Sequence, residues 1–241
     1  MVVFVIMFKF DKLVFGDLGW GDELIFATLM TILVSIFSMG LGLFIAIFAA
    51  WAKITTNKFL NLLSSFYTTV VRGVPELLVI YLIFFGGSAA VMKLAKVFGY
   101  EGYIELNAFT ISVVAIGIIS ATYSSEVLRA AYLSIPYGQI EAAKTIGLSR
   151  IQILYKILAP QILRHALPGL GNVWQVTLKD TSLISVTGLV EIMRQTRIAS
   201  NVEHSPLTFL ITAAFLYLFL TTFSGKFFNY AERKVNKGSV S

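Results

Sequence analysis

The chain has 241 residues, of which 57% are hydrophobic and only 13% are charged, and it contains no cysteine. Because soluble domains carry ~25% charged residues, most of this chain is expected to face lipid or other membrane helices. The missing cysteines exclude disulfides and thiolate metal sites, and the net charge of +6, spread over short loops, argues against nucleic-acid binding.

The amino-terminal segment 1–23 is slightly acidic and is therefore expected to lie outside the cytoplasm. Within it, Met1–Phe8 is too short for a span and is expected to be interfacial or an end of the first helix. Leu24–Ala52 has no ionisable residue in 29 positions, more than the ~20 needed to cross a bilayer, which predicts the first span. The basic loop Lys53–Lys58 predicts a cytoplasmic turn.

The second span is predicted over Phe59–Val91, with a break between Arg72 and Glu76. Pro75 pushes Val74 out of the helical region of backbone space, so the helix is expected to kink there. Charged residues beside a break in apolar sequence make Arg72 and Glu76 candidates for a transport path. The alternative is a salt bridge between these two residues, which are four apart, at a purely structural kink.

An external return is expected over Met92–Glu105, followed by the third span at Leu106–Tyr132. The second half of this span is polar and approaches the cytoplasm. Glu126 and Arg129 are three residues apart there, so they are expected to pair on one helix face in a structural role.

A weaker fourth span is predicted over Pro168–Leu189, and a fifth over Pro206–Phe228 after an external loop. The tail 231–241 is basic and is expected to be cytoplasmic, which gives five spans with the amino terminus outside and the carboxy terminus inside. A structural Lys–Asp pair is the alternative to a pathway role in the fourth span, whose candidate pathway residues are Gln175, Lys179, Asp180, Thr181 and Ser182.

The cytoplasmic passage 133–160 is charged and amphipathic, unlike the apolar segments on either side. Its sequence predicts two short helices joined at a glycine that adopts a positive φ, with a serine capping the second helix. Such a pair, lying flat on the membrane, is suited to docking a cytosolic partner, although a surface helix that only anchors the loop is the alternative. The candidate docking residues are Glu141, Ala142, Ala143, Gly147 and Ser149.

The spacing of this passage carries a family resemblance. The passage resembles the EAA loop of permease subunits in ATP-binding-cassette (ABC) importers. It consists of Glu141-Ala-Ala, three residues, Gly147, nine residues, Ile157 and Pro160, with Ala159 in place of the usual Leu. Further motifs resemble those of the polar amino acid permeases: Arg72-Gly-Val-Pro75, Ser125-Glu126-Val-Leu-Arg129, Ile135-Pro136-Tyr-Gly138-Gln-Ile-Glu141 and Leu178-Lys-Asp-Thr-Ser-Leu183. Within these permeases, the chain most resembles one of the two paralogous membrane subunits of histidine/lysine/arginine and opine (octopine, nopaline) uptake systems.

The resemblance implies an all-α membrane protein of the type I ABC importer (MetI-like) permease fold, with five transmembrane helices over 24–230 and a cytoplasmic coupling helix. It also implies residence in a bacterial inner membrane. The implied partners are a paralogous permease subunit in a heterodimer, two copies of a cytoplasmic ATPase, and a periplasmic solute-binding protein that delivers a polar or basic amino acid or an opine.

The chain itself is expected to be non-catalytic and to need no cofactor or metal. It has no Gly-x-x-x-x-Gly-Lys-Ser/Thr phosphate loop, so ATP is expected to be bound by the partner ATPase. No internal duplication is evident, so a pore with two halves requires a second chain. The alternatives are a standalone secondary transporter or channel, which works without nucleotide, and a membrane anchor for a soluble complex.

Overall fold

The computed structural model of the chain describes residues 9–16, 19–100, 102 and 107–236, and every regular element in these ranges is helical. The all-α prediction is therefore confirmed for the described residues. In chain order the elements are η1 (Phe10–Leu13), α2 (Gly21–Ile54), α3 (Lys58–Gly73), α4 (Glu76–Tyr81), η2 (Leu82–Gly86), α5 (Gly87–Val97), α6 (Ala108–Leu133), α7 (Tyr137–Thr145), α8 (Arg150–Ile153), η3 (Leu154–Leu158), α9 (Ala159–Asp180), η4 (Thr181–Thr187), α10 (Ile192–Glu203) and α11 (Pro206–Asn236).

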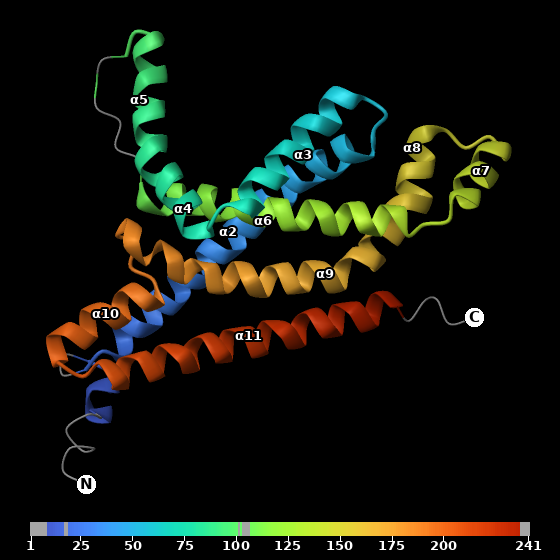
Figure 1. The fold of residues 1–241 in the computed structure, drawn as a ribbon. Coiled ribbons are helices and arrows are strands. Elements are labelled where there is room, and N and C mark those ends of the chain that lie inside the picture. Colours follow the sequence, from blue (N-terminus) through green and yellow to red (C-terminus); the bar gives the residue numbers. More distant parts are fainter. Residues whose placement is uncertain (1–8, 17–18, 101, 103–106, 237–241) are drawn as a thin grey trace.

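The centre of the fold is the crossing of α2 and α6, which pack more extensively than any other pair of helices in the described ranges (Figure 1). Small residues allow this approach. A Cβ on Gly42 of α2 would lie 2.0 Å from the Ser120 Oγ atom of α6, and one on Gly117 would lie 3.0 Å from Leu41. Close contact through glycine is typical of membrane helices, where association depends on packing instead of the hydrophobic effect.

The predicted second span is broken where the sequence indicated. Helix α3 ends at Gly73, the backbone is extended at Val74, and α4 begins at Glu76 after Pro75. The helix then continues through η2 and α5 to Val97, so the first part of the expected external return is helical. Helix α5 stands away from the remaining bundle in Figure 1.

Four helical stretches within the described residues are long and apolar enough to cross a membrane: Gly21–Ile54, Glu76–Val97, Ala108–Leu133 and Pro206–Val235. The expected fourth span falls on α9 and η4, which do not meet this criterion, so the count of five is not confirmed. Nevertheless α9 runs beside α6 and α11, with which it is in contact (Figure 1).

The helices define two ends of the molecule (Figure 1). The start of α2 and helix α10 lie at one end, while α7, α8 and the last turns of α11 lie at the other. At the α10 end, Lys9 and Lys12 pair with Glu203 at 3.8 and 3.7 Å, which ties η1 to α10. The prediction for Met1–Phe8 falls outside the described residues.

Candidate functional site

The predicted helix–glycine–helix is present at the end of the molecule formed by α7 and α8. Gly147 separates the two helices and adopts a φ of +81°, in the left-handed region that favours glycine. Ser149 caps α8 in a reciprocal capping box: its Oγ accepts from the Gln152 amide at 3.3 Å, and its own amide donates to Gln152 Oε1 at 2.8 Å. The turn is therefore fixed by local hydrogen bonds.

The docking candidates divide into inward-facing and outward-facing residues. Ala143 is 2% exposed and packs with buried side chains of α8 and η3, so it joins the two helices instead of offering a surface. Glu141 and Ala142 are exposed, as are Gly147 and Ser149. Apolar side chains lie among them, and Ile146 is 76% exposed.

The pair of helices is joined directly to a long helix of the bundle. Helix α8 passes through the π-helical turn η3 into α9 without a loop. Pro160, at the start of α9, has no amide hydrogen, so the residue four positions earlier loses its usual helical donor. The wider π-helical turn η3 ends two residues before Pro160. The chain therefore runs from α8 into α9 as one continuous helical path.

The break between α3 and α4 places two charged side chains around one tyrosine. The Tyr123 hydroxyl of α6 donates to Glu76 Oε1 at 2.9 Å, and the Arg72 guanidinium lies 5.3 Å from the centre of the Tyr123 ring. Among the described residues, Arg72 and Glu76 do not form an ion pair with each other. The purely structural salt bridge that was the alternative for this pair is therefore not observed.

A second carboxyl group joins this cluster from the end of α9. The side chain of Asp180 is close enough to interact directly with Glu76. Lys179 is exposed and makes no ion pair with Asp180 in the described part of the chain, so the structural Lys–Asp pair is not observed either. Two carboxylates in contact repel each other when both are ionised, and a nearby cationic group would relieve that repulsion.

The other candidates of the fourth span lie elsewhere. Gln175 faces α11, where its Nε2 atom would lie 3.3 Å from a Cβ on Gly225. Thr181 is fully buried and donates to the Leu178 carbonyl oxygen at 2.7 Å, while Ser182 is partly buried. The structure thus brings Arg72, Glu76 and Asp180 together and leaves Gln175 and Thr181 in helix packing.

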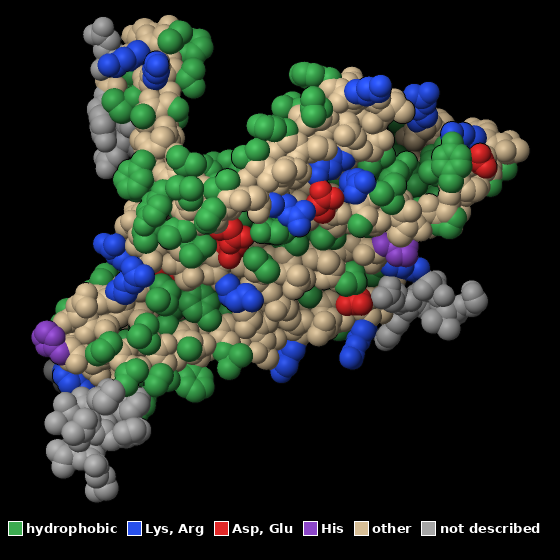
Figure 2. Space-filling model, viewed as in Figure 1, with side chains coloured by type: hydrophobic (Ala, Val, Ile, Leu, Met, Phe, Trp, Pro, Cys, Tyr) green, Lys and Arg blue, Asp and Glu red, His purple; other side chains and the backbone are tan. Residues whose placement is uncertain are grey.

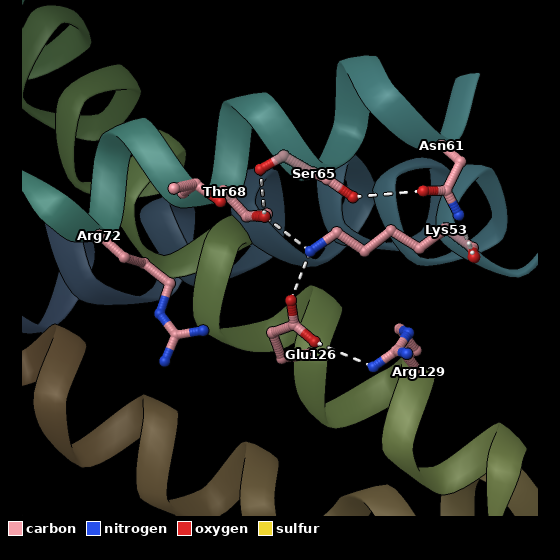
Figure 3. A pocket seen from close by; sticks show the side chains of 8 residues that line it. Lys53, Asn61, Ser65, Thr68, Arg72, Glu126 and Arg129 are labelled. Atoms are coloured by element: carbon pink, nitrogen blue, oxygen red, sulfur yellow. Dashed lines mark hydrogen bonds and ion pairs between the residues drawn. The ribbon is translucent and has the colours of Figure 1, made fainter. Parts of the chain in front are cut away.

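A polar cavity of about 350 Å³ lies between α3, α6 and the end of α2 (Figure 3). Lys53 forms an ion pair with Glu126 and also donates to Thr68 Oγ1 at 2.6 Å. Glu126 pairs with Arg129 at 3.6 Å, which confirms the predicted pairing of these two residues on one helix. The cavity is lined by Lys53, Asn61, Ser65, Thr68, Thr69, Arg72, Glu126 and Arg129.

Sequence reasoning missed the role of Lys53, which it placed in a loop. Helix α2 continues to Ile54, and the Lys53 side chain is only 7% exposed. One signal was available, since Asn61, Ser65, Thr68 and Arg72 recur at helical spacing and mark one polar face of α3. In Figure 2, charged side chains of both signs gather along the middle of the visible face, with hydrophobic side chains around them.

Comparison with known proteins agrees with this geometry. Residues 42–237 match the family described as "Binding-protein-dependent transport system inner membrane component". The chain is 50% identical over 224 residues to the nopaline transport system permease protein NocQ of Agrobacterium fabrum, covering 92% of this chain and 95% of the relative. It is 34% identical over 220 residues to the histidine/lysine/arginine/ornithine transport system permease protein HisQ of Escherichia coli, covering 91% and 96%. Among solved structures, a crystal structure of an amino acid ABC transporter with histidines matches with a TM-score of 0.75 at 29% identity, covering 89% of this chain and 95% of that chain.

Proposed function

The chain belongs to the family of inner membrane components of binding-protein-dependent transport systems, and we propose that it forms half of the translocation path of an ABC importer. The substrate class is polar or basic amino acids or opines, the classes named for its relatives. The observation that carries the proposal is the glycine-linked, capped helix pair at one end of the molecule, joined through η3 to the helix that supplies Asp180.

The helix pair α7 and α8 is the coupling element, and a separate ATPase binds and hydrolyses ATP. Glu141, Ala142, Gly147 and Ser149 lie on its exposed surface, where the Glu141 carboxylate is available for charge-assisted hydrogen bonds to the partner. Ala143 acts from inside by holding the two helices together. Movement of the ATPase is then converted into rotation or displacement of α9, as switching between two states requires.

The substrate contacts are the charged residues at the break of the second span. Glu76 and Asp180 hold the ammonium or guanidinium group, and Arg72 is suited to a carboxylate because its guanidinium offers paired donors. Lys179 and Ser182 flank Asp180 and line the same path. Gln175 and Thr181 support this site by packing α9 against its neighbours.

The complete transporter contains a paralogous permease subunit, two ATPase copies and an external solute-binding protein. Helix α9 with η4 supplies the fifth crossing, because it extends beside α6 and α11. The start of α2 and the end of α11 lie at opposite ends of the molecule, which supports an odd number of crossings. The basic residues of the α7–α8 end favour the orientation with the amino terminus outside and the carboxy terminus inside.

Uptake into cells lacking this gene tests the proposal. Wild-type chain should restore uptake of one class among radiolabelled nopaline, octopine, arginine, lysine and histidine. Glu76→Gln should lose that uptake at an unchanged amount of protein in the membrane, because it removes one of the two carboxyl groups of the cluster. Glu23→Gln makes the same change at an exposed position of α2 and should transport normally. Restoration of none of these solutes by the wild type would overturn the proposal.

A further inference from the structure

The polar cavity next to the Glu76 cluster, with which it shares Arg72, carries an excess of positive charge. Its lining contains three cationic side chains, Lys53, Arg72 and Arg129, and one anionic side chain, Glu126. The net charge of these four groups is therefore +2. The remaining lining residues are neutral side chains with hydroxyl or amide groups, which can donate hydrogen bonds to an anion.

The two arginines are only partly neutralised within the described chain, because the single carboxylate of Glu126 also pairs with Lys53. Lys53 and Glu126 satisfy each other through their ion pair, and Thr68 accepts a further bond from Lys53. Arg72 makes no hydrogen bond or ion pair with a described residue, and its contact is the face of a tyrosine ring. Arg129 approaches a Glu126 oxygen at 3.6 Å, which is longer than a hydrogen bond, and its side chain is 43% exposed.

We propose that this cavity is a second, inner station of the transport path, where Arg72 and Arg129 hold the carboxylate of the passing amino acid or opine. Guanidinium groups suit this task because they bind carboxylates through two parallel hydrogen bonds. The proposal rests on the proposed function, since it names a further site for the same substrate. Lys53 and Glu126 are positioning residues that hold α2, α3 and α6 around the cavity.

The position of Arg72 links the inner station to the Glu76 cluster. Arg72 lines the cavity and also stacks on Tyr123, whose hydroxyl donates to Glu76. When the cationic group of a zwitterionic substrate lies at Glu76, Arg72 is therefore available in the same set of contacts to bind the substrate carboxylate. From Arg72 the polar face of α3 continues through Thr68 and Ser65 toward the end of α2 (Figure 3). The substrate carboxylate is passed from Arg72 to Arg129 along this face.

Protection of a single cysteine tests the inner station directly. The chain has no cysteine of its own, so Ser65→Cys places one thiol in the cavity lining. The whole complex is placed in phosphatidylcholine discs, which contain no anionic lipid, without nucleotide. Alkylation of this chain by a maleimide is followed by its mass. The probes are L-arginine, octopine and agmatine, which is arginine without its carboxylate.

We expect L-arginine and octopine to slow alkylation of the Ser65→Cys thiol and agmatine to leave it unchanged. Arg129→Gln should weaken protection by about 10-fold or more in apparent affinity, as expected for loss of a charge-assisted hydrogen bond. Arg129→Lys, which keeps the charge but loses the paired donors, should give intermediate protection. Arg197→Gln, on an exposed arginine of α10, should protect normally, and an Asn201→Cys thiol on the same helix should react at one rate throughout.

Equal protection by agmatine would show that the carboxylate is not recognised and would overturn the proposal. Absence of protection by any probe, or full protection with Arg129→Gln, would overturn it as well. The proposed function is judged separately by radiolabelled uptake through the wild-type chain. Uptake without cysteine protection removes only the inner station, whereas protection in a chain that restores no uptake contradicts the proposed function.

Discussion

Gly147 provides the sharpest test of the coupling helix pair, because its backbone alone determines the cost of substitution. Its φ of +81° lies in the left-handed region, and a Cβ added there would meet no atom within 4 Å. Gly147→Ala therefore introduces no clash, and the whole penalty is the backbone strain of ~1–2 kcal/mol. That energy lowers the population of the native turn by roughly 5- to 30-fold relative to an open turn.

The assay is ATP hydrolysis stimulated by the loaded binding protein, with the assembled complex in lipid discs. Gly147→Ala should reduce stimulated hydrolysis by up to this factor while the chain remains inserted in the membrane. Gly147→Asn should lose less, because asparagine tolerates the left-handed region. Gly138→Ala is the matched control: its Cβ also meets nothing within 4 Å, but its φ is not positive, so activity should be retained. Wild-type stimulation by the Gly147→Ala variant would show that the left-handed turn at Gly147 is not needed for coupling.

Three further substitutions probe contacts around the site. Ser149→Ala removes the cap of α8 and should cost about 1 kcal/mol, seen as faster amide hydrogen exchange in the first turn of that helix. Lys53→Met removes the nearer of the two cations paired with Glu126, while Arg129 remains 3.6 Å away. It should lower the stability in detergent by less than the ~3–5 kcal/mol of a fully buried pair, seen as a lower unfolding temperature, and exposed Lys58→Met should not. Tyr123→Phe removes the hydrogen bond to Glu76 but keeps the ring, and should weaken substrate-stimulated hydrolysis by about 5-fold, with unchanged basal hydrolysis.

Features that depend on neighbouring residues were predictable from the sequence. The turn at Gly147 and the cap at Ser149 follow from single residues with strong backbone or capping preferences. The break before Glu76 follows in the same way from Pro75. Each of these conclusions required only a few residues of context, and each is confirmed.

Contacts between distant segments were not predictable in this way. The alternative in which Arg72 and Glu76 pair with each other applied the spacing rule of a continuous helix, but the extended backbone at Val74 interrupts that helix. Both side chains instead contact Tyr123, which lies on another helix. Similarly, the ion pair between Lys53 and Glu126 was not predicted, because the two residues are 73 positions apart in the sequence.

Periodicity and hydropathy are weak indicators for two helices of this chain, one of them short and the other heavily packed. Helix α7 has nine residues, too few for periodicity to show that Ala143 faces inward. Helix α9 is polar for a membrane helix, yet it packs against both α6 and α11. Its hydropathy consequently understates its place in the bundle, and a fifth span remains a prediction.

The nucleotide dependence of transport distinguishes an ABC importer from a secondary transporter. The complete complex, with this chain in liposomes and the binding protein outside, is supplied with ATP and magnesium on the ATPase side. We expect uptake of the substrate to require ATP and to stop when the ATPase cannot hydrolyse it. Substrate accumulation driven by an ion gradient, without ATP or without the ATPase, would instead show that the protein is a secondary transporter.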